Sequence, residues 1–294
     1  MGRVAFVNGS YVPHGHAQVH VEDRGYQFAD GVYEVIPVMA GRQIDATGHL
    51  ERLDRSLREL RIARPMSDRA LRLVIDEVIR RNRVRNGAVY LQVTRGVAKR
   101  DHAFPAAADP ALVVYANPKI GATRKAVLEN GVRVITVQDQ RWARRDIKTV
   151  SLLPNCLAKQ AAREAGAYEA VMIDDEGFVT EGSSTNCWIV DADGRLVTRP
   201  ASNAILNGIT RLSLMALAER EGIRFEERAF TLDELRNARE VFLTSASGLG
   251  VPVVQVDERV IGNGKPGSVT LQVAGMFDRY VASGDTDAAA GRTV

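Results

Sequence analysis

The segment RRDIKTVSLLPN, residues 144–155, raises the question on which the fold and chemistry of this chain depend. Lys148 follows two arginines, Arg144 and Arg145, and precedes an apolar run at 150–153. Nearby cations and burial both disfavour an ammonium ion, so we expect both to lower the pKa of this lysine. A lysine with a lowered pKa is a nucleophile that forms Schiff bases with carbonyls. The commoner alternative is a lysine at a strand end with its charged head in water.

Length and composition indicate a folded protein of about two domains. The chain has 294 residues, 45% of them apolar and 26% charged, and its net charge of +3 is too small to favour nucleic acid. The two cysteines, Cys156 and Cys187, form no C-x-x-C pair, so neither a metal site nor a redox site is indicated. No apolar run is long enough to span a membrane, and MGRVAFVNGS at the start has the pattern of a strand, so we expect it to be no signal peptide. We expect a cytoplasmic protein that binds neither nucleic acid nor membranes.

The first part of the chain combines strand patterns with two amphipathic helices. Asn8-Gly9 is a hairpin turn signal, and Ser67 is placed to cap a helix. Four further segments have the period of a helix or a strand: helices at 49–62 and 67–82, and strands at 88–96 and 111–117. We predict a smaller N-terminal α/β domain at residues 1–117, followed by an interdomain linker at 118–124, which contains Pro118 and Gly121.

The second part alternates strands and helices again. The segments are strands at 132–138, 169–174 and 186–191, and helices at 155–166 and 208–222; residues 240–248 form a buried strand that runs into a small-residue turn. Thr231 and Glu234 form a capping box. We predict a larger C-terminal α/β domain at 125–282 and a disordered tail at 283–294. The fold class is therefore α+β, with two α/β lobes and a cleft between them as the expected place for a small-molecule site.

Two further features could complement a reactive lysine. In TEGSSTN, residues 180–186, Glu181 is a carboxylate that we expect near a cation, with Ser183, Ser184 and Thr185 as donors around it; an acidic turn between strands is the alternative. In NGITRL, residues 207–212, a glycine precedes a helix whose unpaired N–H groups favour an anion such as phosphate. TSASG at 244–248 could supply more N–H groups.

Together these features suggest pyridoxal 5′-phosphate. A lysine would bind its aldehyde, a carboxylate would pair with its ring nitrogen, and the turns would hold its phosphate. A P-loop is absent from the sequence, so a nucleotide phosphate is not indicated.

Eight segments, in order over roughly residues 1–280, closely resemble the D-amino-acid aminotransferases of the fold-type IV pyridoxal-phosphate enzymes. They are EDRGYQFADGVYEV, HLERLDRSL, QVTRG with RDHAFP, RWARRDIK, LAKQAA, TEGSSTN, GITR and FLTSAS. The resemblance implies that Lys148 is the Schiff-base lysine and proton carrier, and that Glu181 partners the ring nitrogen. It also implies further cofactor-binding residues: Arg52, Ile209, Thr210, Ser245 and Ala246 at the phosphate, and Leu206 against the ring. The family usually has a hydroxyl where Ala246 stands, so one side-chain donor is expected to be missing.

The same resemblance implies the substrate. Arg100 and His102 resemble the pair that, with Tyr33, binds the substrate carboxylate, and an arginine can donate two hydrogen bonds to a carboxylate. In the family this loop reaches the neighbouring subunit's active site, so a homodimer is expected. The implied activity moves an amino group from a D-amino acid such as D-alanine to a 2-oxo acid such as 2-oxoglutarate.

Four alternatives stay open. Branched-chain aminotransferases, (R)-amine transaminases and aminodeoxychorismate lyases share the fold, but we would not expect a complete arginine–histidine carboxylate site in them. A cofactor-binding protein without turnover is the fourth, although no residue needed for catalysis is missing. The sequence leaves open which residue contacts the ring hydroxyl of the cofactor, because Phe178 lacks the phenol found there in some relatives.

Overall fold

A computed structural model describes residues 2–118, 124–246, 248–289 and 291–292. The chain forms two compact units. The first consists mainly of Met1–Ile120 and Ile147–Ser151, and the second of Gly121–Asp146 and Leu152–Thr293. The segment that carries Lys148 thus belongs to the first unit, whereas the predicted domain boundaries put it in the C-terminal domain. Most of the predicted linker, residues 119–123, lies outside the described residues.

The first unit is built on a six-stranded sheet whose strand order is β2-β1-β6-β5-β3-β4. All of its strand pairs are antiparallel. The strands are β1 (Val4–Val7), β2 (Ser10–Pro13), β3 (Gly31–Met39), β4 (Arg42–Gln43), β5 (Gly87–Thr94) and β6 (Ala111–Asn117). The predicted hairpin is confirmed: Val7 pairs with Ser10, and Asn8 and Gly9 both have positive φ.

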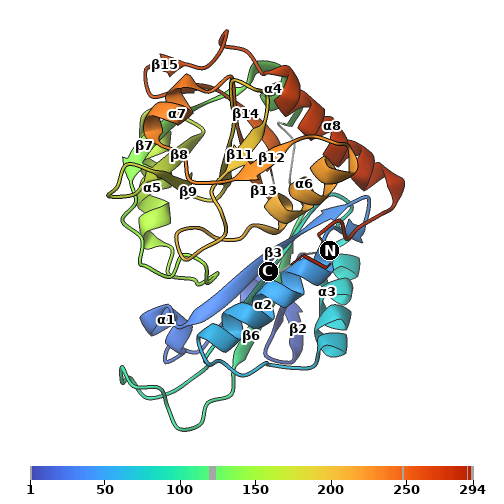
Figure 1. The fold of residues 1–294 in the computed structure, drawn as a ribbon. Helices are drawn as coiled ribbons and strands as arrows, with labels where there is room; N and C mark the ends of the chain where they lie inside the picture. Colours follow the sequence, from blue (N-terminus) through green and yellow to red (C-terminus); the bar gives the residue numbers. More distant parts are fainter. Residues whose placement is uncertain (1, 119–123, 247, 290, 293–294) are drawn as a thin grey trace. The chain divides into compact units, whose positions relative to one another are not determined.

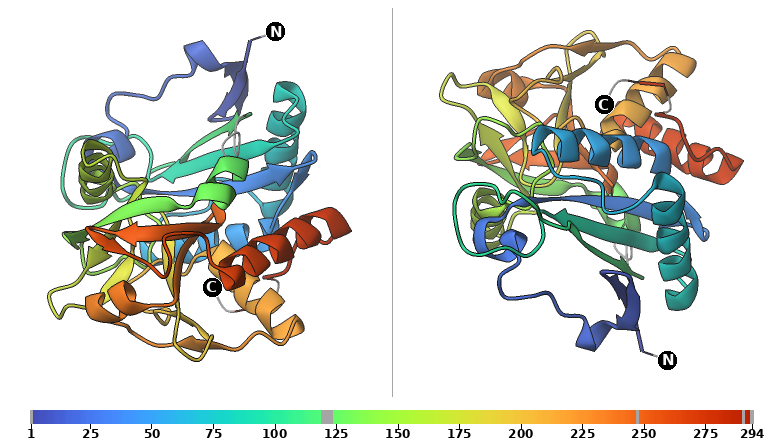
Figure 2. Two further views of the ribbon diagram at one scale, coloured as in Figure 1. Left: turned by 90° about the horizontal axis from the view of Figure 1, so that it is seen from above. Right: turned by 90° about the horizontal axis from the view of Figure 1, so that it is seen from below.

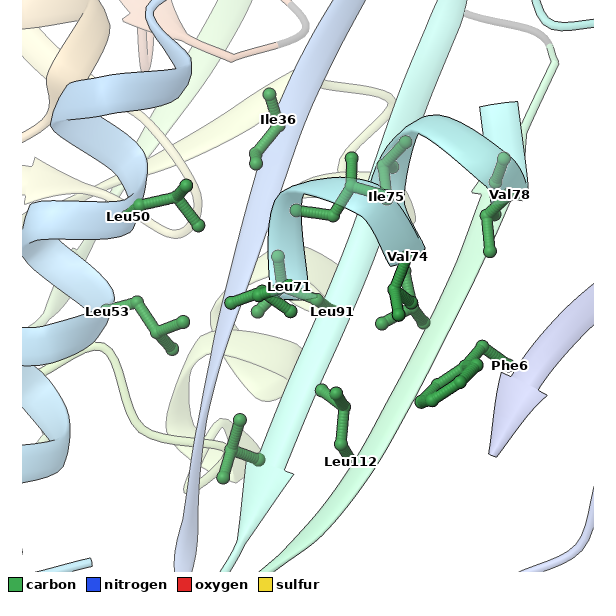
Figure 3. Packing of buried hydrophobic residues seen from close by; sticks show 14 of the residues in the cluster. Phe6, Ile36, Leu50, Leu53, Leu71, Val74, Ile75, Val78, Leu91 and Leu112 are labelled. Atoms are coloured by element: carbon green, nitrogen blue, oxygen red, sulfur yellow. The ribbon is translucent and has the colours of Figure 1, made fainter. Parts of the chain in front are cut away.

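Two helices pack on one face of this sheet, α2 (Ala46–Glu59) and α3 (Asp68–Asn82). Both were predicted, and the Ser67 cap is confirmed because its side chain accepts a hydrogen bond from the N–H of Ala70. Figure 3 shows the core between them: leucines and isoleucines of the helices, such as Leu53 and Ile75, point to Ile36, Leu91 and other strand residues. Short helical segments lie at His14–His16 and in α1 (Arg24–Phe28).

The second unit contains a nine-stranded mixed sheet. Its order is β12-β11-β10-β13-β14-β7-β8-β9, and β15 pairs with β14. The strands are β7 (Val132–Gln138), β8 (Glu169–Ile173), β9 (Val179–Gly182), β10 (Asn186–Val190), β11 (Leu196–Thr198), β12 (Phe225–Glu227), β13 (Glu240–Ser245), β14 (Gly248–Val256) and β15 (Arg259–Val260). The helices are α4 (Arg124–Asn130), α5 (Leu153–Glu164), α6 (Ile209–Arg220), α7 (Leu232–Asn237) and α8 (Ser268–Ser283). Figure 1 labels these elements.

Several local predictions for the second unit can be compared with the structure. The capping box is confirmed, since Thr231 and Glu234 exchange both hydrogen bonds. The segment TEGSSTN, for which an acidic turn was the alternative, begins inside strand β9, Val179–Gly182. In the tail expected to be disordered, Ala288 and Ala289 are buried, and the N–H of Ala288 donates to the hydroxyl of Tyr280. Among the described residues, no helix has both the length and the apolarity needed to cross a membrane.

Candidate active site

The predicted site residues divide between the two units. The first unit carries Lys148 with Tyr33, Arg52, Arg100 and His102, and the second carries Glu181, Leu206, Ile209, Thr210, Ser245 and Ala246. Each group is described within its own unit.

Lys148 lies on a short extended segment that continues the sheet beside β3. The N–H of Tyr33 donates to the carbonyl of Lys148 (3.0 Å), and the N–H of Val150 donates to the carbonyl of Gly31 (3.1 Å). On its other side, the N–H of Lys148 donates to the hydroxyl of Ser56 on α2 (3.3 Å). The lysine backbone is therefore held by a strand and a helix, which fixes the origin of its side chain.

The lysine side chain lies over an aromatic ring. Its Nζ is 4.2 Å from the ring centroid of Tyr33, and Tyr33 stacks on Tyr90 on the adjacent strand. These tyrosines lie on the sheet face opposite the apolar core, since Val32 and Glu34, one residue to either side of Tyr33, point to the core. An aromatic face favours an ammonium ion.

The two arginines that precede Lys148 are both neutralised within the second unit. Arg144 forms two contacts of 3.0 Å with Asp146, and Arg145 lies 3.2 Å from Asp139. Each guanidinium has a carboxylate neighbour that compensates its charge.

Arg52 lies in a buried ion-pair cluster between α2 and β3. Its Nε and Nη2 donate to the two carboxylate oxygens of Glu34 at 2.7 and 2.8 Å, and Nδ1 of His49 lies 2.7 Å from Glu34 Oε2. Burial alone would raise the pKa of Glu34, but the charge and hydrogen bonds of Arg52 outweigh it and lower that pKa strongly. Burial lowers the pKa of His49, so its ring is neutral at pH 7 and donates to the carboxylate. The cluster fixes the plane of the Arg52 guanidinium.

Arg100 and His102 lie on the exposed loop between β5 and β6. Both lie against the ring of Phe28 at the end of α1, at 5.0 Å for the Arg100 guanidinium and 5.4 Å for the His102 ring. Tyr33 contacts Lys148 and Tyr90 instead. Within the first unit, the predicted carboxylate-binding residues therefore lie on two separate elements.

In the second unit, Glu181 is a buried residue of β9 and not part of an exposed turn. Its carboxylate accepts hydrogen bonds from the Arg141 guanidinium, from Nδ2 of Asn186 (3.0 Å) and from the N–H of Leu206 (3.1 and 3.2 Å). The expectation of a cationic neighbour is met by Arg141. Burial raises the pKa of Glu181, and the charge and hydrogen bond of Arg141 offset this only in part.

The donors predicted around Glu181 were wrong. The hydroxyls of Ser183 and Ser184 donate to the carboxylate of Glu169 instead, the latter at 3.0 Å. The antiparallel pairing of β8 and β9, in which Val171 lies opposite Gly182, brings Glu169 next to these serines. The serines lie beyond the end of β9 at Gly182, so their hydroxyls donate to Glu169 on the neighbouring strand and not to Glu181.

Arg141 is shared between two acids. It donates to Glu181 and, through Nε (3.0 Å) and Nη2 (2.8 Å), to Asp139, which also accepts from the Thr180 hydroxyl at 2.7 Å. The pKa of Arg141 is raised: burial lowers it, but the charge of Glu181 and the bonds to Asp139 outweigh burial. This arginine therefore keeps a permanent positive charge next to Glu181.

The residues expected at the cofactor ring and phosphate are connected to Glu181 by hydrogen bonds. Asn186 bridges Glu181 and the carbonyl of Leu206 (2.9 Å), and Gly208 is the N-cap of α6. A Cβ at Gly208 would lie 2.0 Å from Asn186 Oδ1, so a larger residue there would displace the Asn186 side chain that bonds Glu181. The helix start that contains Ile209 and Thr210 is thus held near the Glu181 carboxylate, and its unpaired N–H groups can receive a phosphate.

The second predicted phosphate turn lies at the end of the neighbouring strand. Thr244 of β13 is the cross-strand partner of Asn186, so Ser245 and Ala246 follow one and two residues beyond it. The strand pairing shifts register between Leu243 and Ser245, which marks the start of the turn. The structure therefore brings all six predicted residues of the second unit to one end of β9, β10 and β13.

Several residues of the site were assigned no role from the sequence: Glu34, Ser56, Asn186 and Arg141. Glu34 and Ser56 left a recognisable signal. Each is a polar residue at a position that faces the core in an otherwise apolar pattern, VYEVIPV and LDRSL. Such a residue needs a buried partner. Arg141 stands in a segment, RWARRDIK, that resembles the family, but its partners depend on tertiary structure.

Comparison with known proteins defines the class. Residues 31–256 match the family described as amino-transferase class IV, and the chain belongs to that family. This confirms the fold-type IV resemblance and the α+β fold inferred from the sequence.

Individual relatives cover nearly the whole chain. A protein of Bacillus licheniformis named D-alanine aminotransferase is 42% identical over 94% of this chain and 96% of its own length. One of the same name from Staphylococcus aureus (strain MW2) is 42% identical over 95% of this chain and 98% of its own. A solved structure of the T.th. branched-chain amino acid aminotransferase with pyridoxamine 5′-phosphate has a TM-score of 0.87, 28% identity, and coverage of 96% of this chain and 95% of that one.

Proposed function

We propose that this chain is a pyridoxal-phosphate-dependent transaminase that moves an amino group from a D-amino acid to a 2-oxo acid. The observation that carries the proposal is the 42% identity, over nearly the full length, to proteins named D-alanine aminotransferase. The arrangement of Glu181, Leu206 and the start of α6 in one hydrogen-bonded group supports it.

The described residues suit the cofactor. The start of α6 and the turn at Ser245–Ala246 offer N–H groups to a phosphate, and Arg52 offers a guanidinium held rigid by Glu34. Glu181 supplies a carboxylate for a pyridinium nitrogen, and Leu206 an apolar side chain for the ring. Lys148 supplies the amine for the aldehyde. When bound, the cofactor acts as an electron sink for the bond that breaks at the substrate α-carbon.

The residues of this chain have distinct tasks. With the cofactor bound, Lys148 would move the proton, because its Nζ would accept it from the substrate α-carbon and hold it during the transfer of the amino group. The carboxylate of Glu181, kept close to Arg141, would pair with the protonated ring nitrogen of the cofactor. Arg100 and His102, with Tyr33, bind the substrate carboxylate and select amino acids over simple amines.

The choice of substrate rests on the relatives and on this carboxylate-binding set. Structures of branched-chain aminotransferases share the fold at 24–29% identity, below the 38–42% of the proteins named D-alanine aminotransferase. Arg100 and His102 favour a D-amino-acid transaminase over an (R)-amine transaminase, because the latter needs no site for a carboxylate. We further propose a cytoplasmic homodimer in which the loop of Arg100 and His102 serves the neighbouring subunit's active site. The exposure of both side chains in the single chain fits that role.

The test is a comparison of amino donors. Purified protein loaded with pyridoxal phosphate is assayed with D-alanine, L-leucine and (R)-1-phenylethylamine, each with 2-oxoglutarate as acceptor. We expect D-alanine to give the highest kcat/KM. A preference for L-leucine or for the amine would replace the proposal with the corresponding alternative, and no turnover of any donor would leave a cofactor-binding protein.

Lys148→Ala provides the control for that assay. The variant should lose transamination and also the visible absorbance of lysine-bound cofactor, because no other amine replaces Nζ. Turnover of D-alanine at the wild-type rate in this variant would contradict the role of Lys148.

A further inference from the structure

A buried arginine supports the exposed loop that carries Arg100 and His102. Arg24, the first residue of α1, is only 2% exposed. Its Nη1 donates to the carbonyl of Asp101 at 2.6 Å and its Nη2 to the carbonyl of His102 at 3.4 Å. The guanidinium thus bonds the backbone of His102 and of the residue between the two predicted substrate ligands.

The same arginine is anchored on its other edge. Its Nε donates to Asp30 at 2.8 Å, and Asp30 also accepts from Arg95 at 2.7 and 3.0 Å. Burial alone would raise the pKa of Asp30, but the hydrogen bonds of Arg95 and Arg24 lower it, so the carboxylate stays ionised. Asp30 therefore keeps the Arg24 guanidinium in one orientation.

The helix that carries Arg24 is itself attached to the loop. The N–H of Arg24 donates to the carbonyl of Gly96 (2.9 Å), and Asp23, the N-cap, accepts from the hydroxyl of Thr94 at 2.9 Å. A Cβ at Gly25 would lie 2.2 Å from Thr94 Cγ2, so glycine allows the helix to lie against the end of β5. Figure 2 shows the loop beside α1 in both views.

Phe28 completes the arrangement. The Arg24 guanidinium lies 4.7 Å from its ring centroid, Arg100 lies at 5.0 Å, and the His102 ring at 5.4 Å. One aromatic ring therefore contacts the arginine that holds the loop and both side chains that the loop presents. Exposed side chains on an unsupported loop lose conformational entropy when they bind a ligand, and prior ordering reduces that cost.

From these contacts we propose that Arg24 is a positioning residue for the substrate carboxylate, acting through the backbone of Asp101 and His102. The proposal deepens the function proposed above and rests on it. Arg24 touches neither substrate nor cofactor; it sets the direction of Arg100 and His102. Its loss should therefore weaken recognition of carboxylates and leave the chemical step and cofactor binding intact.

The test variant is Arg24→Lys. An ammonium can keep the ion pair with Asp30, but as a single point donor it cannot also reach two carbonyls. We expect KM for D-alanine and for 2-oxoglutarate to rise roughly three- to thirtyfold, with kcat within about threefold of wild type. Cofactor affinity, measured by absorbance titration, and kcat/KM for (R)-1-phenylethylamine should stay unchanged. Arg100→Ala serves as the positive control with a larger rise in KM.

Arg95→Lys is the matched control. Arg95 also pairs with Asp30 and stacks on Phe104 in the loop, but its remaining bonds go to the carbonyls of Leu60 and Arg61. The Arg95→Lys variant should therefore have a KM near the wild-type value. An equal rise in KM in both variants, or a fall in kcat and cofactor affinity with KM unchanged, would show a merely structural role and overturn the proposal.

Two other results are informative. If Arg24→Lys is unstable, Arg24→Gln, in which Asp30 keeps its bonds to Arg95, gives the same KM comparison; a wild-type KM in either variant overturns the positioning role. Turnover of D-alanine by the wild type is measured first. If the wild type does not turn over D-alanine, both the proposed function and the role of Arg24 are refuted. If the wild type turns over D-alanine and the Arg24 variants have the wild-type KM, only the role of Arg24 is refuted.

Discussion

Each unit contains a buried arginine–carboxylate cluster, and the two clusters are arranged in opposite ways. In the first unit, one carboxylate, Glu34, meets one arginine, Arg52, and a neutral histidine, and the pKa of Glu34 is lowered. In the second unit, Arg141 is shared by Asp139 and Glu181, and the pKa of Glu181 is raised. Burial raises both pKa values, but Arg52 gives both of its hydrogen bonds to Glu34, whereas Arg141 is divided between Glu181 and Asp139, whose negative charge also raises the pKa of Glu181.

The difference agrees with the roles that we propose for the two clusters. Glu34 stays ionised and holds the Arg52 guanidinium, which we propose as the group offered to a ligand. In the second unit the raised pKa leaves Glu181 as a carboxylate that still gains by receiving a further proton donor, such as a pyridinium. The arginine supports the acid there, whereas the acid supports the arginine in the first unit.

The largest effect is expected from removing the arginine of the first cluster. Arg52→Ala leaves Glu34 buried without its cation, which typically costs about 3–5 kcal/mol of unfolding free energy. Because we propose Arg52 as a ligand of the phosphate, affinity for pyridoxal phosphate should fall while affinity for pyridoxal, which has no phosphate, changes little. Chemical unfolding and absorbance titrations measure the two effects. Equal losses for both cofactor forms would contradict a phosphate-binding role.

A smaller effect, confined to rate, is expected in the second cluster. In Glu181→Gln the amide oxygen can still accept the hydrogen bonds from Asn186 and Leu206, but the negative charge is lost. The half-reaction with D-alanine should slow by roughly ten- to a hundredfold, with the cofactor still bound. Stopped-flow absorbance reports this rate. A wild-type rate in the variant would mean that the charge of Glu181 does not act on the ring.

The smallest effect is the pH dependence of stability, and its sign should differ between the clusters. The lowered pKa of Glu34 gives stability that is complete above its ordinary pKa of 4.5 and is lost as the pH falls further. The raised pKa of Glu181 has the opposite effect: its contribution falls as the pH rises above 4.5 through the raised value. Melting temperatures of wild type, Glu34→Gln and Glu181→Gln between pH 3 and 7 test this. The difference in melting temperature between wild type and Glu34→Gln should become smaller toward low pH. The difference between wild type and Glu181→Gln should not become smaller.

Sequence reasoning performs well where local chemistry decides the structure. The leucine spacing of α2, the Ser67 cap, the Asn8-Gly9 turn and the Thr231–Glu234 capping box depend on residues within a few positions of each other. Strand β14 and helices α4 and α8 were not predicted. In α8, the apolar face is interrupted by Thr270, whose burial depends on the distant Glu240.

For the site, sequence patterns supply residue types but not partners. The resemblance pointed to Lys148, Glu181 and the start of α6. The donors expected around Glu181 were wrong because strand pairing gives Ser183 and Ser184 to Glu169. Likewise, the role of Arg24 depends on the contact of α1 with a loop far along the chain. Such contacts arise from tertiary structure and leave no period in the sequence.

The segment Ile147–Ser151 completes the sheet of the first unit although the chain on both sides of it belongs to the second. Its contact with Ser56 joins residues 92 positions apart. Contacts of such long range close large loops and form slowly during folding. A nascent chain that ends before Ile147 would expose the start of β3 as an open edge, which favours aggregation. Lys148 therefore reaches the sheet of the first unit late in folding, only after β7 and the following loop have been synthesised.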